Sequence, residues 1–325
     1  MIRRRPQLLF MLALLTMAAS STELRYKLEP GPYEVRIVER LTMRDPVQGR
    51  DVDLRVLYPV VEAGRPLPLV IYSTGMFCWP QMYDRITTHW VSHGYVVIQP
   101  NHLDSPNNDA RLQPSQYTLL LPSRARDLSF VLDAAAGIAT GAGMPGRIDT
   151  KRAAAAGHSF GTVISMAKIG LQIKPEFQGP WGEPFDRRFR AAVLMSGIGQ
   201  NMEDMAANAF DGIRRPLLAT GGTRDVGRVD LGELTPEQWR LQPFLLAPPG
   251  DKYALTTEGS DHYMGGLICN KELGGPPDYE AVANVRSTTT AFLDAYLNGE
   301  RAAKKYLRSV DMQAASDGRA WIRRR

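Results

Sequence analysis

A serine stands between two glycines in the stretch Gly157-His158-Ser159-Phe160-Gly161, which has the pattern G-x-S-x-G. In a nucleophile elbow, this pattern places the serine hydroxyl at a sharp turn between a strand and a helix. The glycines are needed there because larger side chains would collide with the neighbouring elements. The pentapeptide alone is moderately specific, so its value depends on what precedes and follows it.

A nucleophilic serine needs a general base, and in strand–turn–helix folds with this elbow the base is a histidine that follows the acid in the chain. The chain has five histidines, and only His262 comes after Ser159. It follows a predicted strand in "TTEGSDHYMGG", where a catalytic loop would lie. We therefore expect His262 to accept the proton of Ser159.

The acid of such a triad must lie between the serine and the histidine. Asp225 is the favoured candidate because it follows a predicted strand at 216–220. Asp230 is a near competitor, while Asp261 is adjacent to His262, and a sequence neighbour rarely points back correctly. The acid would hold the tautomer of His262 and stabilise its protonated form.

An oxyanion hole needs two backbone N–H groups aimed at the developing negative charge. One is expected from Phe160, which follows the serine. The other is expected from Met76 in "STGMFCW", where Gly75 lets the loop approach the substrate. A plain strand-to-helix turn is the alternative interpretation of this segment.

The elements that would position these residues alternate between strands and helices. Two alternating segments joined by turn residues at 44–50 predict an opening hairpin. The apolar runs at 68–73 and 95–100 are typical of strands buried on both faces, and a helix that ends at Gly94 lies between them. The same alternation continues to a closing helix within 281–299. We expect an α/β fold with a mostly parallel sheet and helices on both faces.

The four alanines at 153–156 have high helix propensity, yet this alternation requires a strand before Ser159. Small side chains would let helices pack closely on both faces of a central strand. We therefore predict that tertiary context makes this segment a strand.

With these features, the chain resembles the α/β-hydrolases, in particular the serine branch of the dienelactone hydrolase and platelet-activating-factor acetylhydrolase group. The resemblance covers about residues 33–296, and it rests on the following landmarks: "LRVLYP", "VIYSTG", "VSHGYVVIQPNHLDS", "SRARDLSFVLD", "GHSFGT" and "GGTRD". The chain has Thr74-Gly75 where the relatives typically have His-Gly. The resemblance implies hydrolysis of carboxylic esters. Strict dienelactone hydrolases use a cysteine nucleophile, so Ser159 argues against that activity.

Two cysteines, Cys78 and Cys269, lie near the two loops that should meet at the carboxyl edge of the sheet. A disulfide between these loops and a pair of buried thiols are both open interpretations. Apolar side chains nearby are expected to form the walls of a substrate pocket. These are Met76, Phe77, Trp79, Phe160 and Tyr263.

The N-terminal residues 1–21 combine three arginines, an apolar run and small residues, which predicts a signal peptide and a secreted or periplasmic protein. A single N-terminal anchor is the weaker alternative. Without this segment the net charge falls from +5 to +2, so the composition gives no indication of nucleic-acid binding. The closing Arg323, Arg324 and Arg325 are expected to form a solvated tail. We expect one domain at 22–325. Its expected loop or lid insertions lie at about 175–189, 197–214 and 226–250.

The expected activity is ester hydrolysis by a serine triad, without a cofactor or metal ion. The pair His102 and Asp104 could suggest a metal, but no second cluster supports it, so we expect them to order the loop after their strand. The substrate would be a small-molecule, lipid or polymer ester. A peptidase, thioesterase or acyltransferase with the same triad, or a binding protein without catalysis, remains open, and the sequence does not indicate an oligomeric state.

Overall fold

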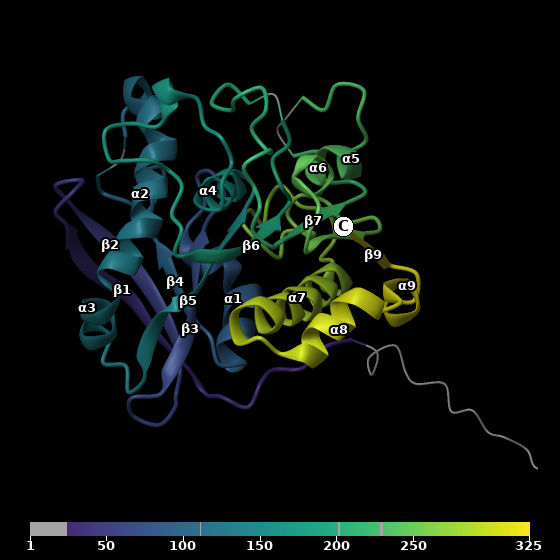
Figure 1. Cartoon of the computed structure of the whole chain (residues 1–325), viewed down its shortest axis with the longest axis horizontal. Helices are drawn as coiled ribbons and strands as arrows, with labels where there is room; N and C mark the ends of the chain where they lie inside the picture. Colours follow the sequence, from purple (N-terminus) through teal and green to yellow (C-terminus); the bar gives the residue numbers. More distant parts are fainter. Residues whose placement is uncertain (1–24, 111, 201, 228–229) are drawn as a thin grey trace, which may run out of the picture.

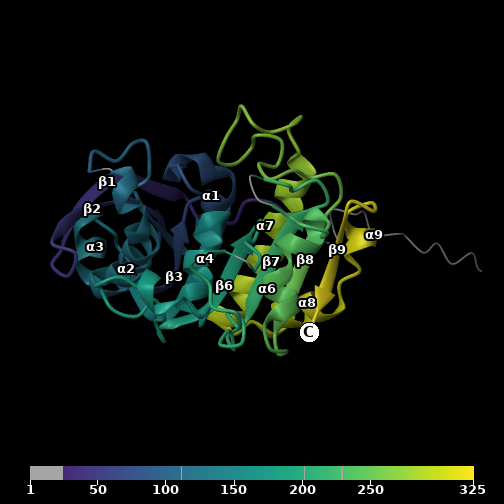
Figure 2. The same cartoon turned by 90° about the horizontal axis from the view of Figure 1, so that it is seen from above.

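The computed structural model describes residues 25–110, 112–200, 202–227 and 230–325, so the predicted signal peptide at 1–21 lies outside the described residues. In this part of the chain, nine strands form one sheet in the order β1-β2-β4-β3-β5-β6-β7-β8-β9. The strands are β1 Val35–Asp45, β2 Arg50–Pro59, β3 Pro66–Ser73, β4 Val96–Pro100, β5 Arg147–His158, β6 Phe189–Met195, β7 Leu217–Gly222, β8 Lys252–Thr257 and β9 Ala320–Arg324. Figure 2 shows the strands fanned from β1 and β2 at one end of the molecule to β9 at the other.

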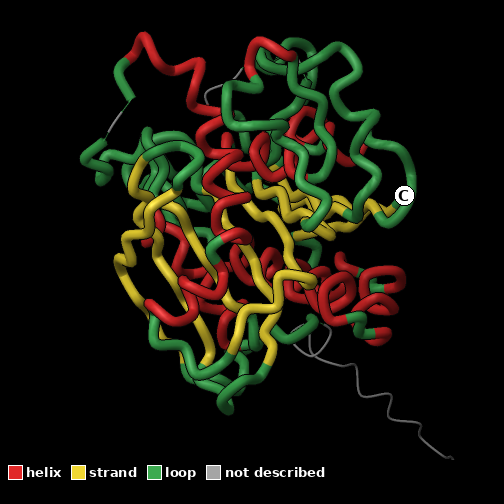
Figure 3. Tube along the Cα trace, turned by 60° about the vertical axis from the view of Figure 1, so that its left-hand side comes forward, coloured by secondary structure: helices red, strands yellow, loops and turns green. Residues whose placement is uncertain are grey.

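The pairing of the strands confirms the predicted hairpin and the mostly parallel sheet. β1 and β2 pair antiparallel, and β2 also pairs antiparallel with β4. The six strands from β4 to β8 in the sheet order are parallel to one another. Parallel neighbours place their carboxyl ends at one edge of the sheet, where loops can gather. Figure 3 shows the strands between helices, with long loops gathered in the upper part of the view.

Helices cover both faces of the sheet, as expected (Figure 1). The buried cluster on one face contains side chains of α2, α4, α5 and α6, and the cluster on the other contains those of α1, α7, α8 and α9. The helices are α1 Asp84–Ser92, α2 Leu120–Asp133, α3 Ala135–Gly141, α4 Phe160–Lys168, α5 Pro236–Arg240, α6 Gln242–Leu246, α7 Tyr279–Leu293, α8 Arg301–Ser309 and α9 Met312–Ala315. Short 3₁₀ segments cover Pro80–Tyr83, Pro114–Leu119 and Pro175–Phe177, and a π-helical turn covers Asp294–Asn298. No helix in the described ranges is long and apolar enough to cross a bilayer.

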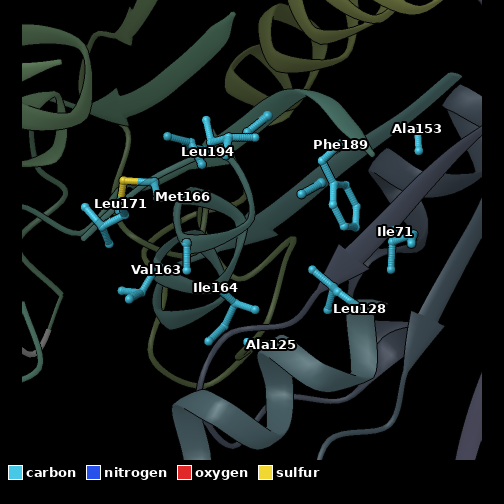
Figure 4. Packing of buried hydrophobic residues seen from close by; sticks show 14 of the residues in the cluster. Ile71, Ala125, Leu128, Ala153, Val163, Ile164, Met166, Leu171, Phe189 and Leu194 are labelled. Carbon is cyan, nitrogen blue, oxygen red and sulfur yellow. The ribbon is translucent and has the colours of Figure 1, made fainter. Parts of the chain in front are cut away.

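The alanine run forms the central strand β5, as predicted against its helix propensity. Ala153 and Ala155 belong to the buried cluster of α2 and α4, while Ala154 and Ala156 belong to the cluster of α1 and α7. Figure 4 shows Ala153 beside the side chains of the first cluster. Successive side chains of a strand point to opposite faces, so the run supplies small side chains to both layers.

The C-terminal end differs from the expectation of a solvated tail of arginines. Residues 320–324 form β9, which pairs antiparallel with β8. This strand forms because the side chains of Ala320 and Ile322, two residues apart, are buried on one of its faces. The backbone of Arg325 also exchanges hydrogen bonds with that of Lys252.

The expected insertions at 175–189 and 197–214 are largely irregular, and the third contains the helices α5 and α6. Of the three, the last two contribute side chains to the pocket described next.

Candidate active site

Ser159 lies in a strained turn between β5 and α4. Its φ of 52° falls in the left-handed region, which a serine adopts only where its surroundings enforce it. A Cβ on Gly157 would lie 2.3 Å from the carbonyl oxygen of Gly161. A Cβ on Gly161 would lie 2.1 Å from the carbonyl oxygen of Ser73. Both positions therefore exclude any side chain, which explains the glycines of the motif.

A continuous hydrogen-bonded chain links Ser159 to the histidine and acid that the sequence favours. The Nε2 atom of His262 lies 3.0 Å from the Ser159 Oγ, and its Nδ1 atom lies 2.7 Å from the Asp225 Oδ1. A carboxylate only accepts hydrogen bonds, so Nδ1 carries the proton and Nε2 is free to accept the proton of Ser159. Ser159, Asp225 and His262 follow β5, β7 and β8, so all three lie at the carboxyl edge of the sheet.

The competing aspartates have other partners. The carboxylate of Asp261 accepts the N–H groups of Tyr263, Gly265 and Gly275, and thereby shapes the loop around His262. The carboxylate of Asp230 accepts the N–H of Gly232 at the surface. The structure thus brings Asp225 to the histidine and keeps the other two acids away from its ring.

Arg240, which the sequence analysis missed, binds the same carboxylate oxygen of Asp225 as His262 does. Its Nε lies 2.8 Å from the Asp225 Oδ1, and the guanidinium also donates to the carbonyl oxygens of Asp225, Val226 and Gly197. Burial raises the pKa of the Asp225 carboxyl. The charges of His262 and Arg240 lower this pKa by more than burial raises it, so the net pKa is below its usual range. The acid is therefore ionised in the folded protein. No local motif marks Arg240, which stands in the third expected insertion.

The two expected oxyanion donors are both unpaired among the described residues. Neither the N–H of Phe160 nor that of Met76 makes a hydrogen bond in this part of the chain. Phe160 begins α4, and its N–H therefore belongs to the positive end of a helix. These two groups are available for an anionic oxygen beside Ser159.

His158 connects the loop of Met76 with the loop of His262. Its Nε2 lies 2.9 Å from the carbonyl oxygen of His262, and its Nδ1 lies 3.0 Å from the Tyr83 hydroxyl. That hydroxyl accepts the N–H of Gly75 at 2.9 Å. Burial, and then the charge of His262, lower the pKa of His158 well below its usual value. A neutral ring that donates from Nε2 accepts the Tyr83 proton at Nδ1, so each bond in this chain has one direction.

A pocket of about 670 Å³ opens above Ser159 and His262. All five side chains expected in its walls line it, namely Met76, Phe77, Trp79, Phe160 and Tyr263. Further lining residues come from loops that the sequence did not assign to the pocket; among them are Gln81, Met82, Ile198, Met202, Arg240, Lys271, Glu272 and Leu273. The pocket is thus mostly apolar near the serine, and Lys271 and Glu272 add charge.

Cys78 and Cys269 form a disulfide in the structure, with their Cα atoms 5.6 Å apart. Cys78 follows Met76 and Phe77, while Cys269 lies seven residues after His262, and both cysteines line the pocket. The bond therefore joins the loop of the expected oxyanion donor to the loop of the histidine.

His102 and Asp104 order the loop after β4, as expected. The His102 ring lies between the carboxylate of Asp127, 2.9 Å away, and the hydroxyl of Ser73, 3.0 Å away. Asp104 pairs with the buried Arg124. In the described residues, no three His, Cys, Asp or Glu side chains are arranged to hold a metal ion.

The comparison with solved structures agrees with this architecture. No protein-family model matches the sequence, and no curated protein matches it. Among solved structures, the ferulic acid esterase from Streptomyces cinnamoneus is similar with a TM-score of 0.57 and 20% sequence identity. The match covers 94% of this chain and 98% of the esterase. The arrangement of strands and helices, together with this likeness, shows that the chain has the α/β-hydrolase fold.

Proposed function

We propose that the chain is a serine hydrolase that cleaves carboxylic esters through an acyl-enzyme intermediate. The observation that carries the proposal is the hydrogen-bonded chain from Ser159 through His262 to Asp225 at the base of a mostly apolar pocket. The likeness to a ferulic acid esterase and the resemblance to serine-type dienelactone hydrolases and platelet-activating-factor acetylhydrolases support the same reaction class.

In the proposed reaction, His262 Nε2 takes the Ser159 proton while the serine Oγ bonds to the ester carbon. The carbonyl oxygen becomes an oxyanion that the N–H groups of Phe160 and Met76 stabilise. His262 then gives the proton to the departing alkoxide, which leaves as an alcohol and forms the acyl-enzyme. A water molecule, deprotonated by His262, releases the acid and restores Ser159. Asp225, held by Arg240, orients the imidazole and stabilises its protonated form.

The pocket walls near Ser159 are Met, Phe, Trp and Tyr side chains, which fit the acyl or aromatic group of an ester. A peptidase, thioesterase or acyltransferase would use the same triad. A binding protein without catalysis would not need the strained turn at Ser159, which costs about 1–3 kcal/mol in free energy of folding.

The test is a panel of nitrophenyl esters of increasing acyl length and one hydroxycinnamoyl ester. We expect turnover by the wild type and a loss of about 10⁶-fold in kcat for Ser159→Ala. Ser129→Ala is the matched control, since Ser129 lies on α2 with Lys168 and Asp186 as partners and does not line the pocket. Failure of the wild type to turn over any ester, together with no labelling by an organophosphate, would refute the proposal.

A further inference from the structure

The loop that carries Met76 is attached to the protein interior by one buried ion pair. This oxyanion loop, Thr74 to Cys78, follows β3, and Met76 itself is 40% exposed. An exposed loop alone would not fix the direction of a backbone N–H group. Beneath it lie Arg124 of α2 and Asp104 of the loop after β4, whose side chains are both inaccessible to solvent.

The Arg124 guanidinium forms two bonds to the Asp104 carboxylate, from Nε to Oδ1 at 2.9 Å and from Nη2 to Oδ2 at 2.5 Å. Its remaining donors reach the oxyanion loop. Nη1 donates to the carbonyl oxygen of Thr74 at 2.5 Å, and Nη2 donates to that of Gly75 at 3.2 Å. The Asp104 Oδ2 also accepts the N–H of Phe77 at 3.0 Å. The pair thus holds backbone groups on both sides of Met76.

The bond to Gly75 determines where the Met76 N–H points. In a trans peptide, the C=O and the N–H point in opposite directions, and they belong to one rigid plane. The Gly75 oxygen and the Met76 N–H share such a plane, and no peptide bond of the described residues is cis. Arg124 holds that oxygen towards the interior, so the Met76 N–H is directed away from it. Gly75 and Met76 line the same pocket as Ser159.

The bond to Phe77 fixes the next peptide group. Phe77 has a φ of 60°, in the left-handed region that a non-glycine residue occupies only under constraint. Its N–H is held by the buried Asp104 carboxylate, while its side chain is about half exposed at the pocket mouth. Rotation of the Met76 N–H would therefore require that both flanking peptides leave charged partners, and charge-assisted hydrogen bonds are the strong ones.

We propose that Arg124 and Asp104 are positioning residues for catalysis, which set the direction of the Met76 N–H in the oxyanion hole. This inference rests on the proposed ester hydrolysis. A buried ion pair contributes little net stability, because the cost of desolvation offsets the attraction between the charges. Its contribution here is geometric, since the fork of one guanidinium reaches a carboxylate and two carbonyl oxygens at once. A lysine cannot do the same from a single nitrogen.

The test compares Arg124→Lys with Arg126→Lys. Arg126 lies two residues further along α2, and its guanidinium holds the buried Asp45 carboxylate at 3.0 Å through two bonds, away from the pocket. Both substitutions keep the charge and lose the fork, so Arg126→Lys serves as the control for stability. Asp104→Asn is the second variant, because it keeps the side-chain shape but replaces one of the two oxygens with an NH₂ group.

We expect Arg124→Lys to lower kcat by about 10²-fold with KM unchanged, since a misplacement of about 1 Å costs that much. A trifluoromethyl ketone forms a tetrahedral oxyanion adduct with Ser159, and its inhibition constant should rise by the same factor. Asp104→Asn should change both quantities in the same direction. Arg126→Lys should leave kcat and the inhibition constant unchanged. Its melting temperature should fall by about as much as that of Arg124→Lys.

Two results would overturn the inference in distinguishable ways. If the wild type hydrolyses esters, and Arg124→Lys and Asp104→Asn keep the kcat and inhibition constant of Arg126→Lys, the positioning role is wrong while the proposed function stands. If the wild type hydrolyses no ester, the proposed function fails and the positioning role fails with it.

Discussion

The disulfide between Cys78 and Cys269 leads to a prediction of stability that can be worked out from the chain. The cysteines are 191 residues apart, so the bond closes a loop of more than half the sequence. In the chain-entropy treatment, closing a loop of this length lowers the entropy of the unfolded state. This raises the free energy of unfolding by about 5 kcal/mol at 25 °C. For a domain of this size, each kcal/mol corresponds to about 2 °C in melting temperature, so loss of the bond should lower it by about 10 °C.

The variant to make is Cys78→Ala with Cys269→Ala, because both side chains are buried and alanine adds no polar group. Urea unfolding with and without dithiothreitol measures the effect. We expect the wild type to lose several kcal/mol of unfolding free energy in reductant, and the double variant to show this loss already without it. Each single variant leaves one thiol and should match the double variant.

Thiol titration of the denatured protein decides whether the reasoning holds. The wild type should show no thiol before reduction and two after it. Equal thiol counts in the two conditions, or equal unfolding free energies for the wild type and the double variant, would show that the two loops are not covalently joined.

Two further predictions concern charge. Asp225→Asn should lower kcat by about 10⁴-fold, because an amide no longer selects the reactive tautomer of His262, while the exposed Asp230→Asn should leave ester turnover unchanged. An equal loss in both variants would contradict the assignment of the acid. Burial, and then the charge of His93, lower the pKa of His89 to about 3, so only the unfolded state gains its proton between about pH 6.5 and 3. The unfolding free energy should therefore fall as the pH falls below about 6.5, with about 3 kcal/mol lost at pH 4 through this group. In urea titrations at several pH values, the unfolding free energy of the His89→Gln variant should depend less on pH than that of the wild type. An equal dependence on pH in both proteins would refute this contribution.

The fold was predictable where the pattern of neighbouring elements outweighed local propensity. The alanines at 153–156 favour a helix by themselves, but the alternation of strands and helices required a strand there, and the structure confirms one. The C-terminal strand β9 was not predictable in the same way. Ala320 and Ile322 give only a short alternation, and the three arginines after them indicated solvent.

Within the site, the residues that act on their own chemistry were predictable, and those that act through contacts were not. Ser159, Asp225 and His262 have a fixed order in the chain and side chains of a defined reactivity, and the structure brings them together. Arg240 and Arg124 belong to no sequence motif that indicates a role in the site. An arginine in a helix or an insertion is ordinary in sequence, and its partners are decided only when distant segments pack. Asp104 was expected to order its own loop, and its bond to Phe77 is visible only in three dimensions.

Strand β9 has a further consequence for how copies of the molecule behave in solution. It lies last in the sheet order, and β1 lies first, so the two strands leave unpaired backbone groups on which another strand could assemble. β9 ends in Arg323 and Arg324, and β1 carries Arg36, Glu39 and Arg40 among its exposed positions. Charged side chains on edge strands discourage the addition of a further strand. We therefore expect Arg323 and Arg324 to hinder the addition of a strand from another copy at the β9 edge.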